Sequence, residues 1–140
     1  MNPVKLTLLI ASLLFLNTAI AAQTLKFSKG WSPEAPPVTR VMAGYFTVKN
    51  SHKNEILITE ISSPQFDNVE IHRTIHEGGM AKMRWQPHIH VPAGKTVMLE
   101  PGGKHLMLMK PKRRLKKGDT IELQITLSNN MTQTIQLSIK

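Results

Sequence analysis

Two histidine–methionine pairs are the residues of this sequence best suited to chemistry. His72 and Met83 lie on either side of a Gly-Gly dipeptide, and His105 and Met107 lie two residues apart further along the chain. Imidazole nitrogen and thioether sulfur form a soft, neutral ligand set that favours Cu(I) over Zn(II), Mg(II) or Ca(II). Thioethers need no deprotonation, do not form disulfides and bind weakly. The four residues therefore indicate a Cu(I) site outside the cytoplasm that releases its ion by stepwise ligand exchange.

The composition excludes most other metal and redox chemistry. The 140 residues include 8 Met and 6 His but no Cys. The chain therefore has no disulfide framework, thiolate zinc site, iron–sulfur cluster, c-type haem, catalytic cysteine or blue-copper thiolate, and no residue to carry the lipid of a lipoprotein. Carboxylates are few and dispersed, and no Ser-His-acid arrangement has motif context, so we expect that the protein is not an enzyme.

Residues 1–22 are typical of a cleaved secretory signal. A lysine near the N-terminus precedes an apolar stretch over residues 6–16, and small residues follow at Ala19 and Ala21. An uncleaved membrane anchor is the alternative, but the apolar stretch is short for a span of about 20 residues. We expect an exported, periplasmic protein whose residues 23–140 form a single domain.

Short alternating runs follow, separated by turn signals, and no apolar stripe at helical spacing persists for three turns. This pattern predicts an all-β sandwich or barrel. The expected strands cover residues 25–31, 43–49, 55–62, 68–77, 81–86, 95–100, 104–110, 120–127 and 132–139.

The Gly-Gly turn sets the register of one predicted hairpin. Pairing Glu77 with Met80 across it places four side chains on one face: His72, Thr74, Met83 and Trp85. His72 and Met83 are then diagonal neighbours, about 7–8 Å apart. The opposite face carries aliphatic side chains suited to a core, so the two candidate ligands lie on the face that is not committed to packing.

The second pair belongs to a run that alternates in the same way. Leu106 and Leu108 form one face of the predicted strand, whereas His105, Met107 and Met109 form the other. Residues two apart in a strand point the same way, so His105 and Met107 can converge on one ion. We expect Met109 to cover this site rather than to bind the ion.

Side-chain parity also predicts the loop of the last hairpin. The apolar rows of residues 121–127 and 135–139 share a face only if the connecting loop has an odd number of residues. Ser128-Asn129-Asn130, with one Asn in the left-handed region, is the natural three-residue loop.

The spacing of the four candidate ligands matches the motif of the PCuAC family of periplasmic copper chaperones, which the sequence resembles over about residues 25–140. The surrounding segments that resemble this family are 43–48, 69–72, 91–94, 100–109 and 115–119. The resemblance implies a cupredoxin-like Greek-key β-sandwich that binds one Cu(I) through His72, Met83, His105 and Met107. It further implies that the protein supplies copper to the dinuclear centre of cytochrome c oxidase, directly or through another copper chaperone.

Further histidines and methionines are weaker candidates. His88 and His90 have the spacing to share a strand face and could form a second, weaker Cu(II) site, and His76 and Met80 lie in the same third of the chain. Trp85 shares a predicted face with His72. A packed aromatic is the expected role for Trp85, with a cation–π contact to the ion as the alternative.

A dense run of basic residues extends from the end of the predicted strand 104–110 toward the predicted strand 120–127. Six of the eight residues 110–117 are positive: Lys110, Lys112, Arg113, Arg114, Lys116 and Lys117. A solvated turn is the simplest interpretation, and steering toward an acidic partner or an anionic membrane surface is the alternative. Few aromatic residues argue against nucleic acid. We expect a monomer, and the rival functions are a copper-scavenging or resistance protein and a basic binding module without metal.

Overall fold

The computed structural model describes residues 21–140, which form ten β-strands and no helix. The predicted signal peptide lies almost wholly outside the described residues. The strands are β1 (Lys26–Ser32), β2 (Val41–Lys49), β3 (Ile56–Ser62), β4 (Phe66–Glu77), β5 (Met80–Gln86), β6 (Ile89–Val91), β7 (Thr96–Met98), β8 (Lys104–Pro111), β9 (Thr120–Leu127) and β10 (Thr132–Ile139). The predicted all-β class is confirmed.

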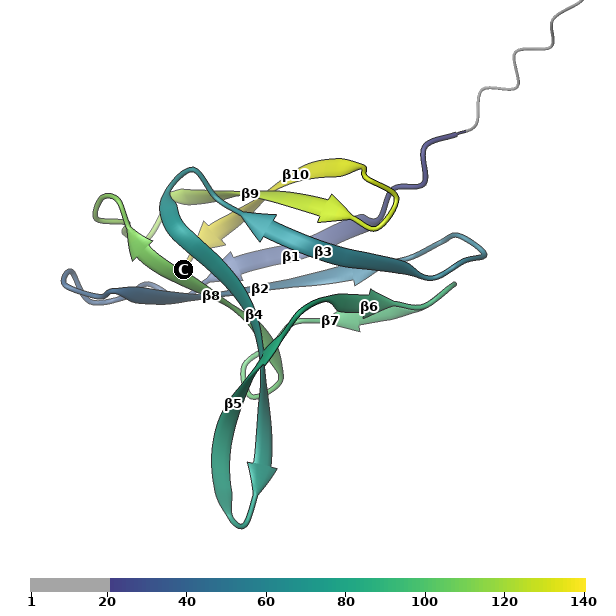
Figure 1. Ribbon diagram of the computed structural model, residues 1–140. Coiled ribbons are helices and arrows are strands. Elements are labelled where there is room, and N and C mark those ends of the chain that lie inside the picture. Colours follow the sequence, from purple (N-terminus) through teal and green to yellow (C-terminus); the bar gives the residue numbers. More distant parts are fainter. Residues whose placement is uncertain (1–20) are drawn as a thin grey trace, which may run out of the picture.

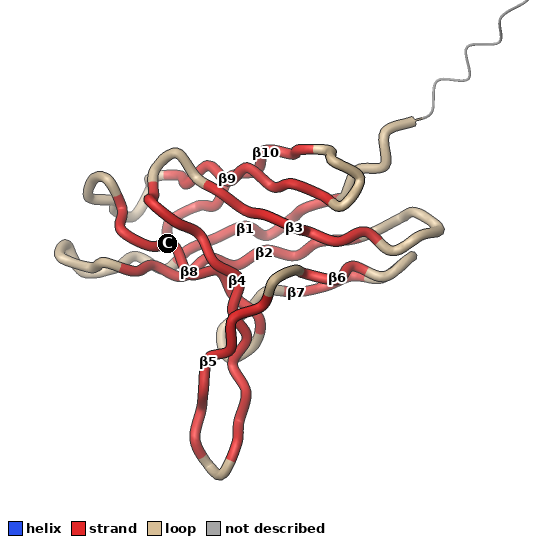
Figure 2. Tube along the Cα trace, viewed as in Figure 1, coloured by secondary structure: helices blue, strands red, loops and turns tan. Residues whose placement is uncertain are grey.

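One continuous sheet contains these strands in the order β5-β4-β8-β2-β1-β10-β9-β3-β6, and β7 pairs with β2. Only the β1–β10 pairing is parallel. Figure 1 shows that the sheet folds over itself, so that β3, β9 and β10 lie above β1, β2 and β8. The distal half of the β4–β5 hairpin projects away from this body as an arm (Figure 2).

The core lies between the two layers and is built by alternation along each strand. In β9, the buried residues are Ile121, Leu123, Ile125 and Leu127, and in β8 they include Leu106 and Leu108. Each fully buried aliphatic side chain contributes about 1.5–3 kcal/mol relative to exposure. This burial fixes which face of β8 points inward, and therefore directs the alternate residues of β8 to the outer face.

The predicted registers and loop are confirmed. Glu77 pairs with Met80, and Thr74 pairs with Met83. The last hairpin has a three-residue loop in which Asn130 adopts the left-handed region at φ 64°.

The ends of several strands differ from the prediction. β2 begins at Val41 and β4 at Phe66, two residues earlier than expected, and β7 covers only Thr96–Met98. Strand β6 was not predicted, because three residues between prolines give too short a pattern; it forms by pairing with β3. No helix long and apolar enough to cross a membrane occurs within residues 21–140.

We expect Leu106→Ala to lower the free energy of unfolding by about 2–5 kcal/mol, because Leu106 is fully buried behind the outer face of β8 and its truncation leaves a cavity. Urea unfolding measures the change. Val38→Ala is the matched control: Val38 is 88% exposed, so its truncation should change stability by no more than about 0.5 kcal/mol. Equal effects of the two substitutions would contradict this description of the core.

Candidate metal centre

The ladder between β4 and β8 brings the two histidines together. His72 and His105 are direct cross-strand partners, and their rings stack with centroids 6.0 Å apart and planes inclined by 27°. Glu70 and Met107 form the next pair on the same face. One ladder therefore gathers two imidazoles and one thioether from segments more than 30 residues apart.

His105 is held in a single tautomer by the backbone before it. The side chain is buried, and its Nδ1 lies 3.0 Å from the carbonyl oxygen of Gly103. Because a carbonyl only accepts hydrogen bonds, Nδ1 carries the proton and donates it. The lone pair of the neutral ring is therefore on Nε2, which is buried and has no hydrogen-bond partner.

His72 is oriented by a side chain instead. Its Nε2 lies 2.8 Å from Oε2 of Glu70, and Asn68 donates from Nδ2 to the other carboxylate oxygen at 3.0 Å. An ionised carboxylate accepts, so Nε2–H is the donor and the lone pair is on Nδ1. Such carboxylate–histidine pairs commonly orient metal ligands and raise their basicity.

The two lone-pair nitrogens have no protein partner. Within residues 21–140, His72 Nδ1 and His105 Nε2 are the only buried side-chain nitrogen or oxygen atoms without a hydrogen bond. Leaving a buried polar atom unsatisfied costs about 1–3 kcal/mol, and such an atom calls for a specific explanation. A ligand that accepts electron pairs from both rings supplies one.

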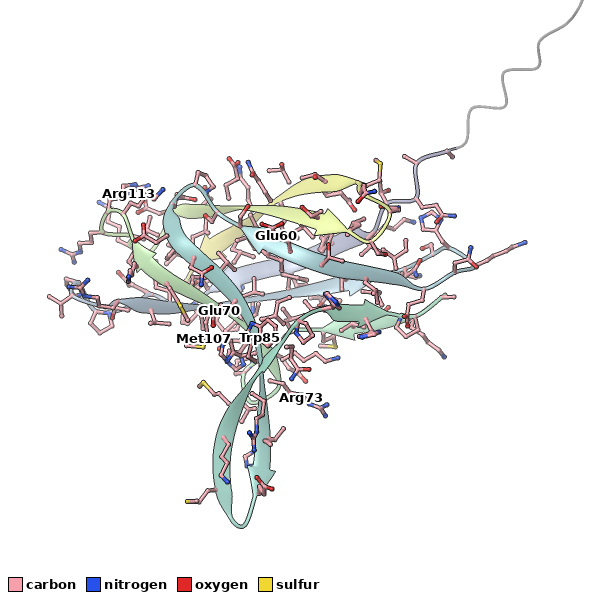
Figure 3. The ribbon with its side chains drawn as sticks, viewed as in Figure 1. Glu60, Glu70, Arg73, Trp85, Met107 and Arg113 are labelled. Atoms are coloured by element: carbon pink, nitrogen blue, oxygen red, sulfur yellow. The ribbon has the colours of Figure 1, made fainter. Side chains whose placement is uncertain are left out.

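The thioethers differ in their surroundings. Met107 is half-buried between the strands, whereas Met83 lies on the projecting arm and is 62% exposed. Met83, His105 and Met107 all line one surface cavity of about 260 Å³, together with Tyr45 and Thr74. Figure 3 labels Met107 where the arm meets the body, and Glu70 is its cross-strand partner.

No Asp, Glu, Lys or Arg lines this cavity, and Glu70 is the cross-strand partner of Met107. Burial raises the pKa of Tyr45, which keeps its hydroxyl protonated at neutral pH and makes it a poor ligand. Within the described residues, no cluster of three or more His, Asp or Glu could hold a metal ion. The site is therefore assembled from imidazole and thioether, a set that suits a soft cation.

The other candidates lie apart from one another. His90 is in β6, at the far end of the sheet order, and its Nδ1 lies 3.3 Å from Oε1 of Glu55. His76 occupies the same face of the arm as Met83, but Met80 pairs with Glu77 on the opposite face. The thioether of Met109 is half-buried near Asn68. Trp85 is 60% exposed, so it is not the packed aromatic that we expected.

Sequence reasoning missed two features of the centre. It did not predict that His72 faces His105 directly, because the register between distant strands is not a local property. It also passed over Glu70, although Glu70 lies two residues before His72 and thus on the same strand face.

Comparison with known structures defines the class of the protein. The copper-bound PCuAC domain of PmoF2 has a TM-score of 0.69 and 19% identity, covering 83% of this chain and 92% of that domain. The Cu(I) form of DR1885 from Deinococcus radiodurans has a TM-score of 0.65 and 28% identity, covering 89% and 81%. The predicted cupredoxin-like fold and the resemblance to PCuAC proteins are confirmed.

The chain belongs to the LpqE-like family, described as "Putative lipoprotein LpqE-like", which it matches over residues 25–139. The "Putative lipoprotein Lxx21020" of Leifsonia xyli subsp. xyli is 28% identical over 120 residues, which are 85% of this chain and 71% of that protein. The protein RP573 of Rickettsia prowazekii is 30% identical over 98 residues. These residues are 69% of this chain, and the chain spans about half (54%) of that relative's length.

We expect Glu70→Ala to disturb the tautomer of His72 and not that of His105. Removal of the carboxylate takes away the acceptor for His72 Nε2–H, whereas His105 keeps its backbone acceptor. Nitrogen-15 NMR of the imidazole rings distinguishes the two tautomers. A His72 ring that stays in the Nε2–H form in the variant would show that Glu70 does not orient it.

Proposed function

We propose that this protein binds one Cu(I) ion through His72, Met83, His105 and Met107 and transfers it to an acceptor. The observation that carries the proposal is the pair of buried, unpartnered imidazole nitrogens on the stacked rings of His72 and His105. His105 lines one cavity with the two thioethers, and His72 is the cross-strand partner of His105. Copper is the cargo of the protein rather than a resident cofactor. The proposal requires no catalysis.

The ligand set explains both the choice of ion and its release. A closed-shell monovalent ion gains little from carboxylates and is well served by imidazole and thioether donors. Met83 is exposed on the arm, so an acceptor's ligand can replace it first without opening the core. The remaining ligands then exchange one at a time, which suits transfer better than storage.

The solved relatives support the same interpretation. PmoF2 contains a copper-bound PCuAC domain, and DR1885 has been solved with Cu(I). We infer that the acceptor is the dinuclear copper centre of cytochrome c oxidase or another copper chaperone, and that transfer takes place in the periplasm after export directed by residues 1–22. The family description, which refers to lipoproteins, supports a location in the cell envelope.

We expect His105→Ala and Met107→Leu each to weaken Cu(I) binding by at least about the 10–100-fold that loss of an outer-shell partner costs. Titration against a Cu(I) chelator measures the affinity, and wild-type protein should bind one ion. Met98→Leu is the control, because Met98 lies in β7 and is exposed outside the cavity. Wild-type stoichiometry near zero, or unchanged affinity in both ligand variants, would reject the site.

We expect the reductively loaded protein to be silent in electron paramagnetic resonance, because Cu(I) has a closed shell. A strong signal typical of nitrogen-coordinated Cu(II) would instead indicate an oxidised site elsewhere. His88→Ala and His90→Ala then test whether these exposed histidines form the weaker Cu(II) site. Loss of the signal in these variants would assign it to them.

A copper-scavenging or resistance protein is the second candidate, because the same ligands serve retention. Mixing the Cu(I) form with an apo oxidase copper domain separates the two functions. We expect copper to move to the acceptor, measured by metal analysis after the proteins are separated. Copper that stays on this protein would favour scavenging.

A further inference from the structure

A basic cleft lies beside the metal centre, between the proline-rich segment 33–40 and the segment that follows β8. It has a volume of about 400 Å³, and four of its lining residues are positive: Arg40, Lys110, Arg113 and Arg114. No acidic residue lines it. Only half of the basic run identified in the sequence contributes, and Arg40 joins it from a different part of the chain.

Most of this charge is not neutralised by the protein. Arg113 Nη1 lies 3.5 Å from Asp119 Oδ2, and the backbone N–H of Lys116 donates to the same oxygen and lowers the pKa of Asp119. Among the described residues, Arg40, Lys110 and Arg114 have no carboxylate within ion-pair distance. The cleft therefore presents three unpaired cations and one that is partly paired.

A backbone hydrogen bond joins two of the positive residues, Arg40 just before β2 and Lys110 near the end of β8. The N–H of Lys110 donates to the carbonyl of Arg40 at 2.7 Å, and Lys110 is held at φ 52°. A left-handed conformation costs a non-glycine residue about 1–3 kcal/mol and persists only where the surroundings enforce it. The chain keeps this costly geometry at the rim of the cleft.

The cleft adjoins the metal centre. Met42 lines both the cleft and the cavity that contains His105 and Met107. Lys110 follows Met107 by three residues along β8, which is about 10 Å at the rise of a strand. A partner held in the cleft is thus within reach of the thioether end of the site.

We propose that this cleft docks an acidic segment of the protein that receives copper. The inference rests on the proposed function and names the feature of the acceptor that it recognises. Arginine guanidinium groups bind carboxylates in a bidentate geometry, and docking here would bring the acceptor's ligands to the exposed side of the copper site. The same charges would accelerate encounter.

The shape of the cleft favours a peptide over a membrane surface. Its walls include Pro36, Pro37, Val38 and Pro111, which form a recess with apolar sides around the cations. Aspartate and glutamate side chains can enter such a recess together with their apolar stems. A bilayer presents a broad surface and has no need of a recess.

Charge reversal tests the cleft. We expect the double variant Arg40→Glu/Arg114→Glu to bind a hexaglutamate peptide at least tenfold more weakly than wild type at low salt. The matched control, Lys112→Glu/Lys117→Glu, makes the same change of net charge in the same region with residues that do not line the cleft. It should change peptide affinity by less than about threefold, since it alters only long-range attraction.

Three results would overturn the proposal that the cleft docks an acidic segment. Equal losses in both double variants would overturn the cleft and leave only net charge. Stronger binding to phosphatidylglycerol vesicles than to the peptide, lost in the cleft variant, would overturn the acidic partner in favour of a membrane. The neutral variant Arg40→Gln/Arg114→Gln repeats the test without introduced acids, and near-wild-type peptide affinity in it would also overturn the proposal.

Copper measurements separate this inference from the proposed function. We expect the cleft variant to keep the wild-type Cu(I) affinity in a chelator titration, yet to transfer copper to an apo oxidase copper domain at least tenfold more slowly than the control variant. Equal transfer rates would overturn the docking role alone. Wild-type protein that binds no Cu(I) would reject the proposed function, whatever the peptide result.

Discussion

The cross-strand pairing of His72 with His105 is the constraint on which the rest of the centre depends. It sets the two rings 6.0 Å apart and aligns Glu70 with Met107 in the adjacent pair. A slip of one residue between β4 and β8 would move one of the histidines to the core face. The buried leucines on the inner face of β8 prevent that slip, because it would expose them to water. The hydrophobic core thus specifies the geometry of the polar site beside it.

The two imidazole rings are oriented by hydrogen bonds to different kinds of partner. The Gly103 carbonyl fixes His105 through the backbone, whereas Glu70 fixes His72 through a side chain that is itself held by Asn68. Both arrangements place the ring proton on the hydrogen-bonded nitrogen and leave the lone pair on the other, buried nitrogen, which has no protein partner. Two independent hydrogen bonds with the same consequence are better explained by a common ligand than by packing, since packing alone gives no reason to bury unpartnered nitrogens.

Much of this arrangement was predictable from the sequence, and the limits are physical. Alternation fixed the faces of β8, and the Gly-Gly turn fixed the register that pairs Thr74 with Met83, because both are local properties. The pairing of β4 with β8 was not predictable, since more than 25 residues and three strands separate them in the chain. The basic cleft was hidden for the same reason: Arg40 is distant from Lys110 in sequence, and only the β2–β8 ladder joins them. Exposure of Met83 follows from the projection of the arm, which no pattern of apolar residues encodes.

The four candidate ligands differ in how firmly the fold holds them, which bears on how an ion would be held and released. His72, His105 and Met107 stand on a ladder anchored by the core. Met83 stands on an arm whose other face carries the half-buried Ile75 and exposed ion pairs between Glu77 and Lys82 or Arg84. Such pairs contribute little to stability, and β5 is paired on one side only. The arm is therefore the part of the centre whose displacement disturbs the fewest buried contacts. In the proposed transfer, an exchange that began at Met83 would leave the other three residues in place until the acceptor had bound the ion. A cleft that held the acceptor next to the cavity, which shares Met42 with it, would favour that order.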